Sequence, residues 1–270
     1  MSQAPPPEPR EGRPRLSAER KAILVLGLLL VVALCLSGGV FLAVSVRVVD
    51  PVIVSYDLAA GTDLTIDVLH ADFALRASTD GRIHVSARGS YAGRPPTLHA
   101  STSGSVTTVG GQGCENRRPR HCSFKVTVAL PPALPLTMHV REGNISATGL
   151  TGPLELGATN GDITASGAHG RLDLRTTNGH ILVLGATSQH VNAATTNGDV
   201  ELVFLRPPTT VSATSTNGNV TVRVPARSVT YLVSTRTLNG LSDISLPSDR
   251  TSTRTLTAQT TNGIVTIAPA

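Results

Sequence analysis

The sequence contains no tryptophan, and its few phenylalanines and tyrosines bring the aromatic share to only 3%. Valine, leucine, isoleucine and alanine must therefore fill any buried core, which suits thin, regularly layered β-strands. The formal charge is +5, but no basic run alternates with aromatic residues that could stack on bases. We therefore predict no nucleic-acid partner.

Catalytic signatures are also missing. The chain holds no Gly-x-Ser-x-Gly elbow, no phosphate-binding loop and no dinucleotide fingerprint, and each of these motifs carries a specific chemistry. The histidines are scattered instead of being spaced as a set of ligands. We predict a protein that is not an enzyme, has no catalytic residue and takes no cofactor.

Cysteine is scarce, with three residues in the chain. Cys35 lies in an apolar segment, whereas Cys114 and Cys122 flank a short polar stretch. Outside the cytoplasm, a pair that closes a short loop is typical of a disulfide. The alternative is two free thiols, or a half-built metal site that includes His121.

The first 46 residues divide into two segments. Residues 1–21 are rich in proline and charge, which predicts a disordered cytoplasmic tail. Residues 22–46 carry no charge, and this run exceeds the roughly 20 residues that a helix needs to cross a bilayer. Basic residues crowd before this predicted transmembrane helix. The positive-inside rule therefore places the N-terminus in the cytoplasm and everything after Arg47 outside, at a bacterial cell membrane.

Two other interpretations of the apolar segment stay open. Ala43, Val44 and Ser45 offer the small residues that a signal peptidase accepts, but the run is longer than the usual apolar region of about 7 to 15 residues. A lipoprotein signal ending at Cys35 fits less well, because Leu34 precedes the cysteine where a small residue is expected.

Beyond the anchor, residues 47–138 show short alternating stretches, which predict an extracytoplasmic β-strand region. One example is 64–68, in which Leu, Ile and Val alternate with Thr and Asp. Asp80-Gly81 stands before another alternating stretch that begins at Ile83. This dipeptide is a hairpin signal.

Residues 139–270 repeat one short turn. Five of its six copies follow a threonine, and their glycines recur at steps of 18 to 23 residues. A period near twenty is typical of repeat architectures. The predicted structural turns are Asn160-Gly161, Asn178-Gly179, Asn197-Gly198, Asn217-Gly218, Asn239-Gly240 and Asn262-Gly263.

Both arms of each repeat alternate with period two. The fourth and sixth residues before each asparagine are apolar, as Leu156 and Leu154 show, and so are the second and fourth residues after the glycine. These positions must face a core. Leu238 intrudes before Asn239, so we expect that unit to be shifted by one residue.

Two topologies fit this pattern, a two-sheet β-solenoid and an antiparallel meander or sandwich. A meander gives no reason for every second turn to have the same sequence while the sequences of the turns between them vary. In a solenoid, each corner lies about 4.8 Å from its counterpart, so like residues stack on like. We predict an all-β, two-sheet β-solenoid-like repeat domain.

Two sets of residues resemble a known family. They are the Thr-Asn-Gly-Asp-Ile and Thr-Asn-Gly-Asp-Val units and the stretch from Val128 to Leu150. The chain from about residue 48 to 270 resembles a bacterial β-strand-repeat domain of unknown function that is labelled "putative adhesin". The resemblance implies a cell-envelope β-repeat protein and supplies no catalytic residues.

Two rows of residues are candidate ligand sites if the coils stack. The first follows the corner glycines and contains Asp162, His180 and Asp199, followed by Asn219. Its oxygens and nitrogens suit a divalent ion or a sugar, but short polar residues also suit turns, and we predict no metal. The second row lies beside the corners and could bind polysaccharide or ice, although β-propensity alone would explain it. It contains Thr159, Thr177, Thr196, Thr216 and Thr261.

The leading prediction is a single-pass membrane protein that displays a non-enzymatic β-repeat domain for adhesion, scaffolding or envelope sensing. Its expected partners are the membrane and an envelope glycan or protein. The alternative is a polysaccharide-binding or polysaccharide-acting β-helix protein. An activity on polysaccharide needs several carboxylates or arginines that converge on one sheet face. The fifth residue before the corner asparagine instead changes from acidic to neutral, through Glu155, Asp173, Asn192 and Ser212.

Overall fold

A computed structural model describes residues 25–33, 49–114 and 122–270. The chain forms two compact units, Met1–Val48 and Val49–Ala270. In the first unit, residues 25–33 are helical and exposed. Within the described ranges, no helix has both the length and the apolar character needed to cross a membrane. The rest of the predicted anchor, the tail and the candidate cleavage site lie outside the described residues.

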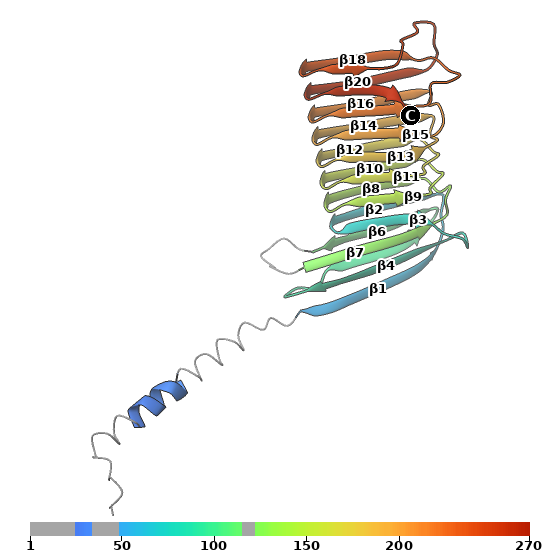
Figure 1. The fold of residues 1–270 in the computed structure, drawn as a ribbon. Helices are drawn as coiled ribbons and strands as arrows, with labels where there is room; N and C mark the ends of the chain where they lie inside the picture. Colours follow the sequence, from blue (N-terminus) through green and yellow to red (C-terminus); the bar gives the residue numbers. More distant parts are fainter. Residues whose placement is uncertain (1–24, 34–48, 115–121) are drawn as a thin grey trace, which may run out of the picture. The chain divides into compact units, whose positions relative to one another are not determined.

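The second unit consists of two facing β-sheets (Figure 1). Sheet A contains, in spatial order, β1 (Asp50–Ala59), β4 (Arg82–Tyr91), β7 (Cys122–Leu130), β3 (Asp72–Ala77), β9 (Ile145–Thr148), β11 (Ile163–Ser166), β13 (Ile181–Ala186), β15 (Val200–Phe204), β17 (Val220–Val224), β21 (Val265–Pro269) and β19 (Ser242–Ile244). Sheet B contains β18 (Leu232–Asn239), β20 (Thr255–Asn262), β16 (Thr210–Asn217), β14 (His190–Asn197), β12 (Leu172–Asn178), β10 (Leu154–Asn160), β8 (Leu136–Glu142), β2 (Asp63–His70), β6 (Val106–Gly113) and β5 (Thr97–Ser103).

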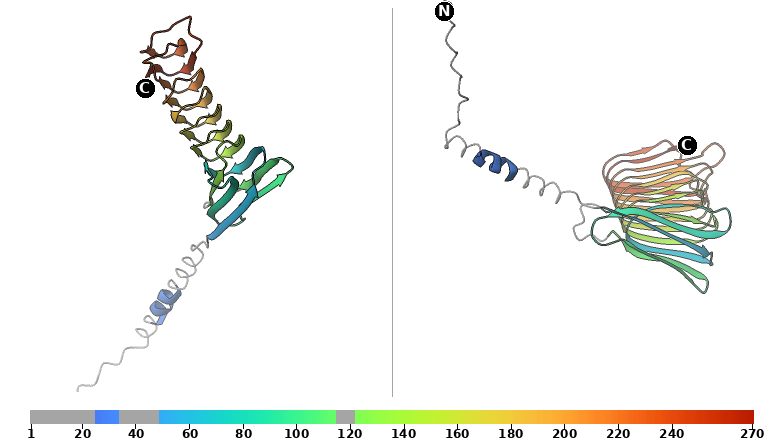
Figure 2. Two further views of the ribbon diagram at one scale, coloured as in Figure 1. Left: turned by 90° about the vertical axis from the view of Figure 1, so that its right-hand side faces the viewer. Right: turned by 90° about the horizontal axis from the view of Figure 1, so that it is seen from below.

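The chain winds from sheet B to sheet A and back, one coil per repeat, as Figure 2 shows from the side. Successive strands of each sheet pair in parallel, and the corner asparagines lie in register, as Asn160, Asn178 and Asn197 do. Antiparallel pairing occurs at one end of the stack, where β4 pairs with β1 and β7, and β5 pairs with β6. The predicted solenoid is therefore confirmed, and the meander is wrong.

The core lies between the two sheets and is almost entirely aliphatic. The positions expected to face inward are buried, including Leu154, Leu156, Ile163 and Ala165 in the first complete repeat. Because equivalent residues pair across every coil, the core is a series of similar layers. This explains how the domain is filled with few aromatic side chains.

The order of the coils in space differs from their order in the sequence at both ends. The β2–β3 coil lies between the later coils β6–β7 and β8–β9, and the β20–β21 coil lies between β16–β17 and β18–β19. As a result, β3 and β4 do not pair, because β7 lies between them. The hairpin expected at Asp80-Gly81 is therefore wrong, although Gly81 does have the positive φ of a turn, 72°.

The shift expected at Asn239 is also wrong. Asn239 pairs in register with Asn262, and Thr237 pairs with Thr260. Leu238 therefore takes the place that Thr261 occupies in the neighbouring coil. Its side chain is 63% exposed, so the substitution changes the surface and leaves the register intact.

Glycine is required at the corners because the backbones of neighbouring coils approach closely there. At Gly218, φ is +154°, and a Cβ would lie 2.0 Å from the carbonyl oxygen of Gly198. Any other residue would be strained in this conformation and would collide with the preceding coil. This close approach gives a physical reason for the repeated glycine.

The end of the stack that holds the first strand is closed by polar and covalent links. The Tyr56 hydroxyl on β1 donates a hydrogen bond to the Leu98 carbonyl oxygen on β5, at 2.7 Å. Cys114, directly after β6, forms a disulfide with Cys122, the first residue of β7. The predicted disulfide is therefore confirmed. His121 lies outside the described residues.

Candidate functional site

The corner asparagines form a continuous ladder across the C-terminal ends of the strands of sheet B. The side-chain Nδ2 of every member except Asn160 donates to Oδ1 of its neighbour, at 2.7 to 2.8 Å. A carboxamide offers both a donor and an acceptor, so one residue type can repeat through the whole stack. The members of this asparagine ladder, in spatial order, are Asn160, Asn178, Asn197, Asn217, Asn262 and Asn239.

The candidate metal or sugar row has a structural role. Asp162 accepts a hydrogen bond from the backbone N–H of His180 at 2.7 Å, and Asp199 accepts one from the N–H of Asn219, also at 2.7 Å. His180 accepts through Nδ1 from the N–H of Asp199, at 3.0 Å. Each of these side chains therefore accepts a hydrogen bond from a backbone N–H of the next coil. Within the described residues, no cluster of three potential metal ligands occurs.

A further row of hydroxyls, inside the corner, was missed by the sequence reasoning. These buried side chains donate to the carbonyl oxygen of the preceding coil's corner glycine, as Thr176 does to Gly161 at 2.9 Å. The signal was available, because the second residue before five of the six corner asparagines is Thr or Ser. The row contains Thr176, Thr195, Ser215, Thr260 and the less buried Thr237.

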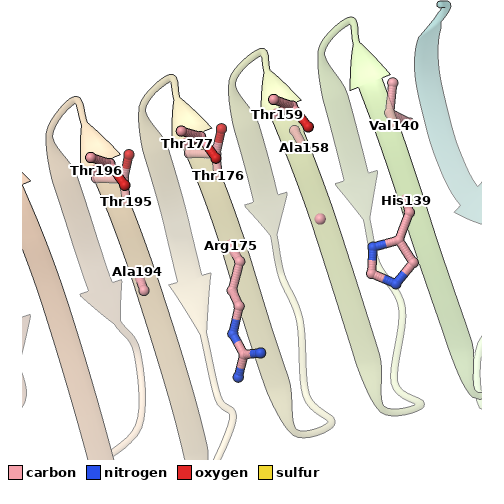
Figure 3. Close-up of a pocket in the computed structure, with 11 residues that line it drawn as sticks. His139, Val140, Ala158, Thr159, Arg175, Thr176, Thr177, Ala194, Thr195 and Thr196 are labelled. Atoms are coloured by element: carbon pink, nitrogen blue, oxygen red, sulfur yellow. The ribbon is translucent and has the colours of Figure 1, made fainter. Parts of the chain in front are cut away.

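The outer threonine row differs from these internal rows. It consists of the threonines directly before five of the six corner asparagines, and none of these side chains is buried. Within the described part of the chain, the five hydroxyls make no hydrogen bond. Figure 3 shows Thr159, Thr177 and Thr196 side by side at the ends of their strands. These hydroxyls are therefore available to a ligand.

Beside the threonine row lies a shallow depression of about 460 Å³ in the outer face of sheet B (Figure 3). It runs across four strands, where His139, Gly157, Arg175 and Ala194 pair in one row. Gly157 makes room for the histidine, since a Cβ there would lie 2.7 Å from His139 Nδ1. Gly157 therefore forms a small floor of the depression, between the side chains of His139 and Arg175.

The charges around the depression are partly paired. The Arg175 guanidinium lies 3.0 Å from a carboxylate oxygen of Asp173, and its side chain is 62% exposed. Asn192 donates to the other oxygen of Asp173 at 3.2 Å. Asp173 is thus held by two neighbours, and Arg175 keeps an exposed guanidinium that can contact a ligand from solvent.

Three groups with displaced pKa values lie away from this face. Hydrogen bonds from the Arg82 backbone N–H, and then from His84, lower the pKa of Asp80. The Thr251 hydroxyl and N–H, and then the Thr230 hydroxyl, lower the pKa of Asp249. Burial raises the pKa of Tyr231. Each of these causes is a local structural contact, and none of them points to catalysis.

Sequence comparison supports the repeat interpretation. A family model described as Toastrack DUF4097 matches residues 133–268, which is half of the chain. The chain belongs to this family. The match begins three residues before β8 and ends within β21, so the Toastrack region contains the asparagine ladder and the threonine row. No curated protein matches the chain.

Several solved structures match the chain at low sequence identity. A putative adhesin from Bacteroides fragilis has a TM-score of 0.52 and 14% identity over 81% of this chain and 97% of its own. A putative adhesin from Parabacteroides distasonis has a TM-score of 0.44 and 13% identity over 82% and 97%. A putative lipid binding protein from P. distasonis has a TM-score of 0.45 and 12% identity over the same shares.

The Toastrack fold explains most of the repeated polar residues without a ligand. Asparagine, aspartate and the inner hydroxyls bond to the neighbouring coil, so their repetition reflects stacking. The threonine row and the adjoining depression receive no such explanation from the described contacts. They form the candidate contact surface of this Toastrack domain.

Proposed function

We propose that this chain is a single-pass membrane protein of the bacterial cell envelope, with its N-terminus in the cytoplasm and its Toastrack domain outside. The uncharged segment 22–46 and the basic residues before it support this orientation. The disulfide between Cys114 and Cys122 is consistent with an oxidising compartment. In this position the domain is a rigid, non-enzymatic module for adhesion or scaffolding.

The ligand that best fits the candidate surface is an envelope glycan. The observation that carries this assignment is the threonine row, whose five hydroxyls have no hydrogen-bond partner among the residues that the structure describes. A polysaccharide presents many hydroxyls along a repeating chain, so a row of donors and acceptors about 4.8 Å apart can bind it at several points. The small floor beside Arg175 leaves space for a sugar ring, and the exposed guanidinium favours acidic sugars.

A polysaccharide-cleaving activity is less well supported by the same face. Glycoside hydrolysis requires two carboxyl groups on opposite sides of the bond that is cleaved. Glu155 and Asp173 are the adjacent acidic pair in register, but Asp173 is held by Arg175 and Asn192. Both carboxyl groups also project from one flat face, so they would contact the same side of a bound chain.

The test is binding of the full chain, in detergent micelles, to an array of bacterial envelope glycans. Thr177→Val together with Thr196→Val removes two hydroxyls and keeps the β-branched shape. Thr221→Val with Thr266→Val is the matched control, because these threonines are in-register neighbours in sheet A. We expect the first pair to weaken glycan binding at least about tenfold, or 1.4 kcal/mol, and the control to leave it unchanged.

Two results would contradict the proposal. Equal binding by both double variants would mean that the threonine row is not the contact surface. Release of shorter sugars from the bound glycan, lost in Asp173→Asn, would show that the protein acts on polysaccharide as an enzyme.

A further inference from the structure

The glycine amide of each interior Asn-Gly pair is held by the next coil. Gly161 donates its N–H to the carbonyl oxygen of Asn178 at 2.9 Å, and Gly263 donates to that of Asn239 at 3.1 Å. The three pairs between them follow the same rule, with Gly179, Gly198 and Gly218 as donors. Stacking therefore gives five of the six glycine N–H groups a hydrogen-bond partner.

Asn239-Gly240 differs because its coil is the last one in the stack. Strands β18 and β19 form the edges of their sheets, so no coil of the described part of the chain lies beyond Gly240. Within the described residues, the N–H of Gly240 makes no hydrogen bond, and both residues are exposed. The Asn239 side chain donates to Asn262 at 2.8 Å, but within the same residues its own Oδ1 accepts nothing.

This difference matters because Asn-Gly is chemically labile. The glycine nitrogen, once it loses its proton to solvent, can attack Cγ of the preceding asparagine. A C–N bond forms, the side-chain nitrogen leaves as ammonia, and a succinimide ring remains. Water then opens the ring at either carbonyl to give aspartate or isoaspartate, so the net reaction consumes one water and releases one ammonia.

We propose that Asn239 is a site of selective, spontaneous deamidation in the folded protein, and that the other five Asn-Gly pairs are protected by the stack. Ring closure needs a free glycine nitrogen that can turn toward Cγ, and Gly240 is the one glycine of the six pairs whose N–H makes no hydrogen bond to the residues that the structure describes. Exposure of the asparagine does not explain the difference, because Asn262 is also exposed. The inference goes beyond the proposed glycan binding and does not depend on it.

The reaction would change the free end of the solenoid. Aspartate at position 239 adds a negative charge and loses the Nδ2 donor, which leaves Oδ1 of Asn262 without its partner. Isoaspartate also adds a backbone atom at the end of β18, where Asn239 pairs with Asn262. Either product loosens the last coil at this corner.

The chain offers a matched internal control for the test. Trypsin cleaves after Arg236, Arg250 and Arg254. It therefore yields peptide 237–250 with Asn239-Gly240, and peptide 255–270 with Asn262-Gly263. Each peptide contains one asparagine, and fragmentation in the mass spectrometer separates deamidation at Asn262 from deamidation at Gln259, which lies in the same peptide. The two asparagines are also direct neighbours in the ladder.

The full chain, in detergent micelles, is incubated in mildly alkaline buffer and sampled over weeks. We expect peptide 237–250 to deamidate at least about tenfold faster than peptide 255–270, which corresponds to about 1.4 kcal/mol in the barrier. In concentrated urea the two rates should converge, because unfolding frees both glycine amides. Asn239→Asp provides the reference for the aspartate product.

Three outcomes would overturn the proposal. The two peptides could deamidate at equal rates in the folded chain. Peptide 237–250 could stay unmodified in the folded chain while it reacts in urea. The selectivity could persist unchanged in urea, which would assign it to the local sequence instead of the fold.

Discussion

The Asn197 side chain donates to Oδ1 of Asn178 across 2.7 Å, and its own Oδ1 accepts from Asn217 at 2.8 Å. One carboxamide thus joins three coils of the solenoid. The contact has no counterpart in a hairpin, where an Asn-Gly turn serves only its own two strands. The repeated asparagine is therefore explained by contacts between coils and not by the turn alone.

Asn197→Ala should lower stability by about 1–3 kcal/mol, because it removes two ladder bonds, so that Oδ1 of Asn178 and Nδ2 of Asn217 each lose their ladder partner. Asn239→Ala removes one bond at the exposed end of the stack and should cost less. Thermal unfolding of the two variants measures the difference. Equal losses would show that the ladder bonds contribute little to stability.

Gly218→Ala should be strongly destabilising, by more than about 3 kcal/mol, because it combines a conformation available essentially to glycine with a backbone collision. Gly104 is the control. It also has a positive φ, +60°, but a Cβ there would meet nothing within 4 Å. Gly104→Ala should therefore cost only about 1 kcal/mol. A loss at Gly218 no larger than that at Gly104 would contradict the close approach of the coils.

The predictable part of the fold is the part that repeats. Equivalent residues of neighbouring coils pair with each other, as Leu154 does with Leu172 and Asn160 with Asn178. The repeat period and the alternation of apolar residues therefore suffice to place them. The position of β20–β21 between β16–β17 and β18–β19 could not be predicted in this way. Every coil presents the same asparagine and the same core layer, so the repeat pattern does not specify which coil is adjacent to which.

The candidate site was only partly predictable for a related reason. The threonine row could be read from its spacing, since it is part of the repeat. The depression depends on residues that break the repeat, namely Gly157 between His139 and Arg175. Its shape follows from the histidine lying over a glycine on the next strand, which is visible only once the strand register is known.

Stability should depend on pH through Asp249. Hydrogen bonds from Thr251 and then Thr230 favour its charged form and lower its pKa in the folded state below 3.8. A depressed carboxyl pKa contributes stability that is present above pH 3.8 and is lost as the pH falls through the folded-state pKa. Asp249→Asn should therefore differ most from the native chain near neutral pH.

Thermal unfolding of the native chain and of Asp249→Asn, measured across the acid range, checks this dependence. Thr230→Val removes one of the donors and should shrink the same pH-dependent difference. A gap between native chain and Asp249→Asn that widens toward low pH would contradict the assigned direction of the pKa shift.

Removal of residues 22–46 should release the protein from the membrane fraction of the cells that make it. If the segment is an uncleaved anchor with the N-terminus inside, protease added to intact cells should digest the Toastrack domain. An epitope placed on the cytoplasmic tail should survive that treatment. Mass spectrometry of the native protein separates the alternatives: a chain that begins after Ser45 would mean that the segment is a cleaved signal peptide. An N-terminal epitope lost to external protease would reverse the predicted orientation.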